Sequence, residues 1–376
     1  MTSLRIATIR GIPIRIHVSF LLVLPFLALL FGRVFNEAAS AAGVPPGALG
    51  GPAWMWGLGL AIALFASVLL HELAHAFFAI QHGGRVRDIV LLMIGGVSRL
   101  EEPPRRPRDE AWMAFVGPLT SLGLGVLAFG LSLLAMRGHS FGPRFALFYL
   151  AQLNVFLGLF NLLPAFPMDG GRVLRALLAP RLGRVRATRI AGLLGKGFAL
   201  LFGLAGLFTG NVLLILVAFF VFMGADAETR SVVLEAALGG LRVNELMSPP
   251  PPPVSASAPI SEIAERMKRE RLLALPVETP GEGVMGIVTA NALKRVPPHV
   301  REEARAETLI ARTTPASPWD EVWIALRSML SQRVPELPVV DQGRLVGMLQ
   351  YSEVTRALQL RELDGFAEHR LHKLEA

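Results

Sequence analysis

The stretch WMWGLGLAIALFASVLLHELAHAFFAI, residues 54–80, decides how the rest of the chain is interpreted. Almost every residue in it is apolar or small, and it is long enough to cross a bilayer as a helix. Near its end stand His71, Glu72 and His75. On a helix, positions 71 and 75 lie one turn apart on the same face, so both imidazoles can bind one cation. Ionisable side chains at membrane depth are costly and usually functional, so we expect a metal site rather than a polar helix end at the membrane surface.

The composition points to a membrane protein. Of 376 residues, 52% are hydrophobic and 18% are charged, and the mean hydropathy is +0.50. The chain has no cysteine, so disulfides and thiolate ligands are excluded, and any zinc ion must be held by histidine and carboxylate. The net charge of +8 could suggest nucleic acid. Because the arginines flank the apolar stretches, we expect them to face the lipid bilayer instead, with no nucleic-acid partner.

Apolar runs predict about six transmembrane helices, with the count least certain over residues 190–226. The predicted spans are residues 17–35, 54–80, 111–136, 145–163, 190–208 and 212–223. Arginines concentrate in residues 85–108 and 172–189, which alternate with loops that carry few charges. Both termini are therefore expected to be cytoplasmic, in a prokaryotic cell membrane. The first run, which follows three arginines, could also be a cleavable signal peptide, but its length favours a retained helix.

A second stretch, in which prolines interrupt the helical pattern, supplies a candidate for a third metal ligand. Residues 161–172 read NLLPAFPMDGGR, and their two prolines interrupt any helix. Non-helical backbone at membrane depth is tolerated only where protein buries it or where it lines a wet cavity. A catalytic zinc site commonly has three protein ligands, so Asp169 is a candidate to join the two histidines. The alternative is that Asp169 only caps the helix that follows.

These two stretches resemble the motifs of the site-2 protease family of intramembrane zinc metalloproteases, over about residues 10–225. The first is His71-Glu-Leu-Ala-His75 and the second is Asn161-x-x-Pro-x-x-Pro-x-Asp169-Gly. Residues 95–100 also resemble the family's membrane-associated β-hairpin, and Gly117-Pro118-Leu119 its Gly-Pro-Leu motif. Ser121 stands where relatives often carry Asn, and we expect this departure to have only a local effect.

The resemblance implies one catalytic Zn²⁺ on His71, His75 and Asp169. Glu72 would then activate water as general base and return the proton to the leaving amine. Asn161 is a second catalytic candidate, as a donor to the oxyanion, although it could instead tie down the broken backbone.

The glycine-containing hairpin is a candidate substrate-binding strand. Gly95, Gly96 and Val97 could pair with an unwound substrate at a sheet edge, or form an interfacial hairpin without a binding role. His82 and His139 lie outside the motifs and are expected to be surface residues.

The last third of the chain has a soluble composition and an internal repeat. Leu275-Pro-Val followed by Gly286-Ile-Val-Thr289 recurs as Leu337-Pro-Val followed by Gly347-Met-Leu-Gln350, each between helical patterns. This arrangement resembles a tandem pair of CBS domains, which implies an adenine nucleotide bound between them.

The family's Thr-x-x-Asp nucleotide motif is incomplete in both copies of this repeat. Thr289 lacks the acid and Glu353 lacks the threonine. The sequence therefore leaves two interpretations: either these two residues bind a nucleotide, or the CBS pair mediates dimerisation or gating without a ligand.

The predicted fold class is a polytopic α-helical membrane domain with a small membrane-associated β-hairpin, followed by a soluble α/β tandem CBS module. The predicted parts are a membrane domain over 1–235, a linker over 236–241, CBS domains over 242–300 and 301–362, and a charged tail over 363–376. The predicted function is an intramembrane zinc endopeptidase that cuts a membrane-anchored protein, under CBS control and in a possible CBS-mediated homodimer. The alternatives are a CBS-regulated transporter or channel, with His71 and Asp169 on the ion path, and an inactive scaffold.

Overall fold

Six helices among the described residues are long and apolar enough to span a membrane. The structure is a computed structural model that describes residues 3–45, 49, 51–93, 95–102, 106–135, 141–279 and 283–363. The six helices are α1 (Val18–Ala41), α2 (Ala53–Gln81), α3 (Pro107–Ala135), α4 (Phe141–Asn161), α6 (Arg184–Thr209) and α7 (Val212–Leu238). The predicted number of spans is confirmed. The chain forms two compact units, Met1–Arg230 and Ser231–Ala376, and α7 passes from the first into the second.

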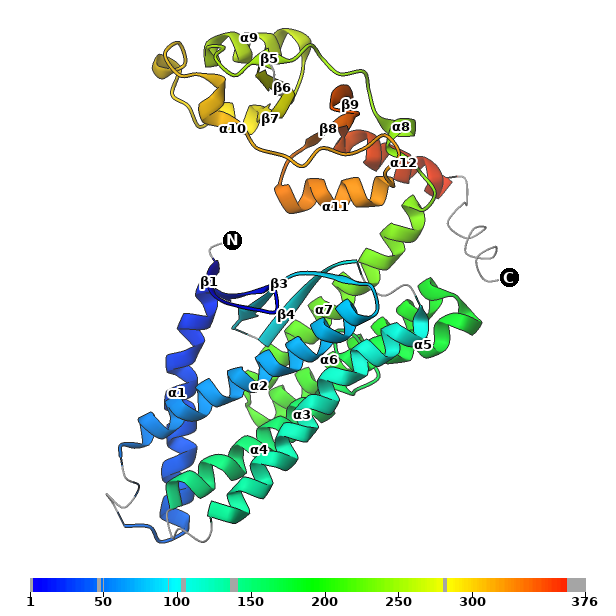
Figure 1. The fold of residues 1–376 in the computed structure, drawn as a ribbon. Helices are drawn as coiled ribbons and strands as arrows, with labels where there is room; N and C mark the ends of the chain where they lie inside the picture. The colour runs from blue at the N-terminus through cyan, green and yellow to red at the C-terminus, as the bar shows by residue number, and fades with distance from the viewer. Residues whose placement is uncertain are drawn as a thin grey trace. The chain divides into compact units, whose positions relative to one another are not determined.

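A four-stranded sheet lies where α1 begins and α2 ends (Figure 1). Its strands, in spatial order, are β1 (Ser3–Ile9), β2 (Ile12–His17), β3 (Arg85–Leu92) and β4 (Gly95–Glu102). The hairpin β3–β4 was predicted, whereas the hairpin β1–β2, which pairs with β3 through a parallel β2, was not. Ile12, Ile14 and Ile89 are buried and pack on Leu73 and Ala76 of α2. The sheet is therefore anchored on the turns of α2 that carry the His-Glu-x-x-His motif.

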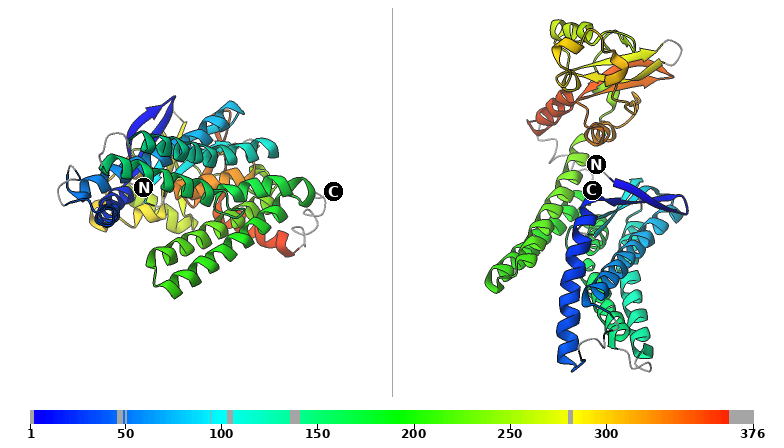
Figure 2. Two further views of the ribbon diagram at one scale, coloured as in Figure 1. Left: turned by 90° about the horizontal axis from the view of Figure 1, so that it is seen from below. Right: turned by 90° about the vertical axis from the view of Figure 1, so that its left-hand side faces the viewer.

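The chain breaks after α4 and restarts as α5 (Asp169–Leu182), which is not among the candidate membrane spans. Between the two helices, Ala165, Phe166 and Met168 are buried. The N–H of Phe166 donates to the carbonyl of Ala191 in α6 at 3.1 Å. The broken segment is thus held inside the protein, and Asp169 stands at the first turn of α5. Two further views show α6 and α7 running side by side (Figure 2).

The second unit contains the predicted repeat as two similar halves. The first half has β5 (Val254–Ser255), α9 (Ile260–Glu270), β6 (Ala274–Thr279), β7 (Gly283–Thr289) and α10 (Ala290–Leu293). The second has α11 (Val322–Gln332), β8 (Glu336–Asp341), β9 (Arg344–Gln350) and α12 (Tyr351–Leu363). Short helices α8 (Val243–Leu246), η2 (Pro298–Val300) and η3 (Ala306–Leu309) complete the unit.

The two halves exchange their leading segments. Ala311, which precedes the second half, pairs with Ile287 of β7, while Ser248, which precedes the first half, pairs with Met348 of β9. Each half therefore completes the edge of the other, which binds them into one module.

The structure differs from the prediction at the junction between the two parts. Residues 236–241 were expected to be a linker, but α7 continues to Leu238, and both Leu238 and Leu241 are buried in the core of the second unit. The glycines at 239 and 240 are turn residues between a helix and a packed core. The predicted tail over 363–376 lies outside the described residues except for its first position.

Candidate active site

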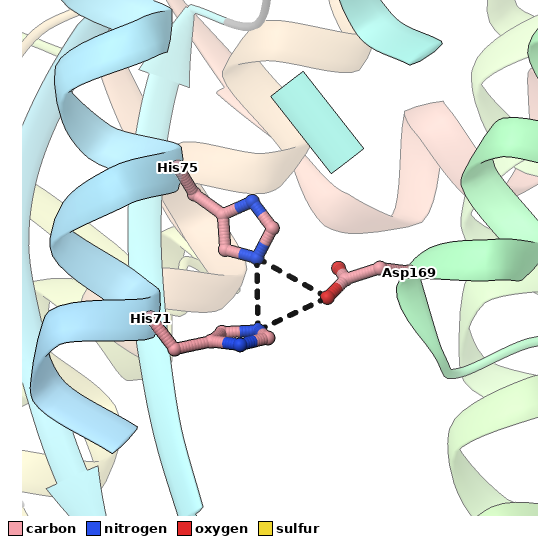
Figure 3. A group of neighbouring side chains, drawn as sticks. All are labelled: His71, His75 and Asp169. Carbon is pink, nitrogen blue, oxygen red and sulfur yellow. Dashed lines mark hydrogen bonds and ion pairs between the residues drawn. The ribbon is translucent and has the colours of Figure 1, made fainter. Parts of the chain in front are cut away.

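His71, His75 and Asp169 meet at a single point inside the membrane unit (Figure 3). The Nε2 atoms of the two histidines are 3.1 Å apart, and each is 3.1 Å from Oδ2 of Asp169. Both histidines are buried and Asp169 is nearly so. The histidines come from successive turns of α2, whereas the aspartate comes from the start of α5, 98 residues further along from His71. This is the only His/Cys/Asp/Glu group with metal-ligand spacing among the described residues.

The remaining ring nitrogens are held by α3. Nδ1 of His75 lies 2.6 Å from the carbonyl oxygen of Met113, and Nδ1 of His71 lies 2.9 Å from Oγ of Ser121. A carbonyl oxygen can only accept, so Nδ1 of His75 carries a proton and Nε2 of the neutral ring presents a lone pair. That lone pair faces a carboxylate oxygen, so the contact is repulsive unless a proton or a metal ion lies between the two atoms. The donor set and its outer hydrogen bonds therefore fit a zinc ion.

Gly117 of α3 makes room for such an ion. A Cβ atom at this position would lie 2.2 Å from Nε2 of His75 and 2.8 Å from Nε2 of His71, which no side chain can do. The sequence supplied the motif Gly117-Pro118-Leu119 but gave no indication of this contact. Ser121, expected to matter only locally, lies within hydrogen-bonding distance of a candidate ligand.

Glu72 lies on α2 beside the cluster and contacts β4. Its Oε2 accepts hydrogen bonds from the backbone N–H of Ser98 at 3.1 Å and from Oγ of Ser98 at 2.6 Å. A Cβ atom on Gly96 would lie 2.5 Å from Cγ of Glu72. The close approach of β4 to the glutamate therefore requires glycine at position 96.

A cavity of about 540 Å³ joins these groups. The predicted site residues that line it are His71, Glu72, His75, Gly95, Gly96, Val97, Asn161 and Asp169. Arg172 and Ser98, neither of which the sequence singled out, line it as well. Asn161 ends α4, and one of its amide N–H groups donates to the carbonyl of Leu157 at 2.9 Å.

A buried ion cluster fixes the helix that carries Asp169. Arg175 of α5 is 5% exposed. Its Nε donates to Oε1 of Glu110 on α3 at 3.0 Å, and its Nη1 donates to Oε1 of Glu228 on α7 at 3.1 Å. The cluster links three helices around the site. Its partners are 65 and 53 residues away in sequence, so no local pattern indicates it.

The other predicted residues have local partners. Nδ1 of His82 donates to the carbonyl of Phe78, and His82 is exposed. Oγ1 of Thr289 accepts from the N–H of Ala292 and caps α10. His139 lies outside the described residues.

Glu353, the second candidate nucleotide contact, is engaged in its own helix. Its carboxylate pairs with Arg356 at 2.9 Å. No described contact of Thr289 or Glu353 joins the two halves of the module at these positions.

The fold and the site together define a multi-pass membrane protein with a candidate metal centre that contains a His-Glu-x-x-His motif. The family model for peptidase family M50 matches residues 59–142 and 136–204, and the CBS domain model matches residues 243–299 and 320–360. Zinc metalloprotease MJ0392 of Methanocaldococcus jannaschii is 32% identical over 362 residues, which are 96% of this chain and 97% of that protein.

The chain therefore belongs to peptidase family M50, the site-2 proteases, as a zinc metalloprotease with a CBS domain pair. The solved structure of a site-2 protease from Methanocaldococcus jannaschii has 37% sequence identity and a TM-score of 0.43, and it covers 61% of this chain and 96% of its own. Family membership favours the protease over the transporter, channel or scaffold that the sequence left open.

Proposed function

We propose that this protein hydrolyses a peptide bond in or near a transmembrane segment of a membrane-anchored protein, with Glu72 as general base. The observation that carries the proposal is the meeting of three metal-binding atoms from α2 and α5 in one cavity, directly beside a carboxylate. Family membership supplies the reaction class. The roles of individual residues rest on the geometry.

In this proposal His71, His75 and Asp169 hold zinc through Nε2, Nε2 and Oδ2. When bound, zinc supplies Lewis-acid chemistry, because it acidifies water and polarises a carbonyl group. The carbonyl of Met113 keeps the imidazole of His75 in the tautomer that directs the Nε2 lone pair inward, and Ser121 orients the imidazole of His71.

Glu72 takes the proton of the attacking water and delivers it to the leaving amine. Asn161 contributes the second N–H of its side-chain amide to the developing oxyanion, because its first N–H is engaged by Leu157. The two residues face the same cavity.

The substrate is proposed to bind as a strand. A helical peptide bond is shielded and internally hydrogen-bonded, so the substrate must unwind before hydrolysis. β4 is the last strand of its sheet, and Gly95, Gly96 and Val97 line the cavity. An unwound substrate segment can add to this edge and present its backbone beside Glu72.

Charge distribution supports an orientation with both termini and the CBS domains in the cytoplasm of a prokaryotic cell. The arginine-rich segment 85–108 joins the end of α2, which carries the histidines, to the start of α3, and the segment 172–189 runs from the first turn of α5 into α6. Water then reaches the site from the cytoplasmic side.

We also propose that the CBS domains, about residues 242–300 and 301–362, regulate the membrane domain. α7 is continuous from the membrane unit to Leu238 in the core of the CBS unit, and its Glu228 bonds the arginine of the Asp169-bearing helix. A shift of α7 therefore acts on α5 directly. The candidate signals are an adenine nucleotide, with Thr289 and Glu353 as contacts, and homodimerisation of the CBS domains.

The test is proteolysis by purified protein in detergent, with zinc added. β-Casein and the solubilised membrane proteins of the expression host serve as probes, and mass spectrometry maps the new termini. We expect wild-type protein to generate cuts that Glu72→Gln does not, while both proteins retain zinc. Equal cleavage by Glu72→Gln would remove the general-base assignment.

A further inference from the structure

Ser98 is the residue that holds Glu72 in this structure. Both hydrogen bonds to the Glu72 carboxylate among the described residues come from Ser98, one from its hydroxyl at 2.6 Å and one from its backbone N–H at 3.1 Å. Both end on Oε2. Oε1 accepts no hydrogen bond from any residue that the structure describes, and Glu72 is one of the residues that line the cavity. The two oxygens of one carboxylate are thus differentiated.

The position of Ser98 in the sheet explains why its N–H is available. Ser98 stands opposite Ile89 in the antiparallel β3–β4 pair. Along such a pair, successive N–H groups point alternately toward the partner strand and away from it. The N–H of Ser98 points away from β3, toward α2, and the carboxylate of Glu72 occupies this donor on the open edge of β4.

We propose that Ser98 is the positioning residue of Glu72: its hydroxyl and N–H fix Oε2 and thereby leave Oε1 as the oxygen that exchanges protons in the cavity. The proposal rests on the general-base role of Glu72 proposed above and deepens it. A glutamate side chain has three rotatable bonds, and holding it in one geometry before the reaction avoids an entropic cost during the reaction. Hydrogen bonds to a charged acceptor are short and strong enough to do this.

The same arrangement couples the base to the proposed substrate strand. Gly96 and Ser98 project their backbone groups to the same edge of β4, two residues apart. The backbone N–H of Ser98 is already bonded to Glu72. A substrate strand would therefore pair with the backbone of Gly96, and its end would lie beside the carboxylate of Glu72. Binding of the substrate strand and orientation of Glu72 then both depend on residues 96–98 of β4.

The contact can be tested without a substrate. In full-length protein in detergent, amide hydrogen exchange resolved at Ser98 should be about tenfold slower in wild type than in Glu72→Ala, with unchanged exchange in α3. Equal exchange at Ser98 in the two proteins would overturn the proposal.

Kinetics on β-casein separate positioning from a purely structural role. Ser98→Ala should lower kcat by about tenfold to a hundredfold, the range expected for losing a hydrogen bond to a charged group, and should leave KM unchanged. Ser98→Thr, which keeps a hydroxyl and suits a strand, should recover most of the lost kcat. A raised KM with unchanged kcat in Ser98→Ala, or no recovery in Ser98→Thr, would contradict the proposal.

Glu72→Gln is assayed in parallel to separate the two hypotheses. If Glu72→Gln cleaves β-casein as wild type does, the general-base role fails, whereas the exchange experiment still reports the Ser98 contact. If Glu72→Gln is inactive and Ser98→Ala has wild-type kcat, only the positioning proposal fails.

Discussion

The Nε atom of Arg175 donates to Oε1 of Glu110 at 3.0 Å, in an environment where Arg175 is almost inaccessible to solvent. This bond ties α5, which begins with Asp169, to α3, which supplies Met113 and its carbonyl to His75. The ion pair therefore holds the helix that begins with Asp169 against the helix that contacts both candidate histidine ligands. Removing one partner of a buried ion pair is strongly destabilising, because it leaves a buried charge uncompensated.

Replacing Arg175 should loosen the metal site. Arg175→Met leaves Glu110 and Glu228 without their common partner, and α5 loses its tie to α3 and α7. We expect zinc affinity to fall by about tenfold, the low end of the range for residues that bond a metal ligand directly, because Arg175 acts on Asp169 only through the position of α5. Competition with a fluorescent zinc chelator measures this. Arg230→Met, which removes an exposed arginine of α7 paired with Asp226, is the matched control, and equal affinities in the two variants would contradict the prediction.

Ser121 should tune the affinity of the site through His71. Ser121→Ala removes the hydroxyl that lies 2.9 Å from Nδ1, so the imidazole is held less firmly and zinc should bind ten to a hundred times more weakly. Ser132→Ala on the same helix is the control, because among the described residues the hydroxyl of Ser132 bonds the carbonyl of Phe129 within α3 and no candidate ligand. Chelator competition measures both variants. Unchanged affinity in Ser121→Ala would show that the ring is held by packing alone.

Gly117→Ala should abolish metal binding while the helix remains folded. The added methyl group would lie 2.2 Å from Nε2 of His75, inside the space that a metal ion needs. Gly123→Ala, on the same helix with no atom within 4 Å of the added methyl, should bind zinc normally. Metal analysis together with circular dichroism checks both. Stoichiometric zinc in Gly117→Ala would mean that α3 can move away from the histidines.

Glu336 predicts a pH dependence of the CBS unit. Burial raises the pKa of this β8 carboxyl to about 7, so between about pH 4.5 and 7 the folded state binds a proton that the unfolded state has lost. The contribution of Glu336 to the stability of the CBS unit is therefore greatest below about pH 4.5 and falls by about 3 kcal/mol in total as the pH rises through 7.

Hydrogen exchange of β8 and β9 peptides from full-length protein at pH 5, 6 and 7 measures this, after correction for the intrinsic rate. Glu336→Gln carries no titrating group and should remove the difference. If the free energy of opening of β8 and β9 in wild type is the same at pH 5, 6 and 7, Glu336 does not make the stability of the unit depend on pH.

The sequence predicted those elements that are marked by a long, continuous pattern of residues within one segment. Apolar runs give the spans because a bilayer requires about 20 apolar residues in one segment. The α7 helix was predicted too short, since Asp226 and Glu228 end the apolar signal but not the helix. The hairpin β1–β2 was not predicted, because only Arg15 is polar between Ile12 and Ile16 and because Pro13 weakens the strand signal.

The part of the candidate site that could be predicted consists of metal-binding residue types at a fixed spacing in the sequence. His71 and His75 are one helical turn apart, so their sequence separation fixes their geometry. The surroundings of the site were not predictable from the sequence. Gly117 and Gly96 matter because they lack a side chain. Ser98 of β4 contacts Glu72 of α2, which lies 26 residues away in sequence. Such contacts depend on packing between segments far apart in the chain.

The most direct test of the central claim is the zinc content of purified protein, measured by plasma mass spectrometry for wild type and Asp169→Ala. Asp109→Ala serves as the control for removing a carboxylate from the membrane unit. The convergence of α2 and α5 predicts about one zinc ion per chain in wild type and in the control, and a small fraction of that in Asp169→Ala after dialysis against a weak chelator. Full zinc occupancy in Asp169→Ala would contradict the three-ligand site.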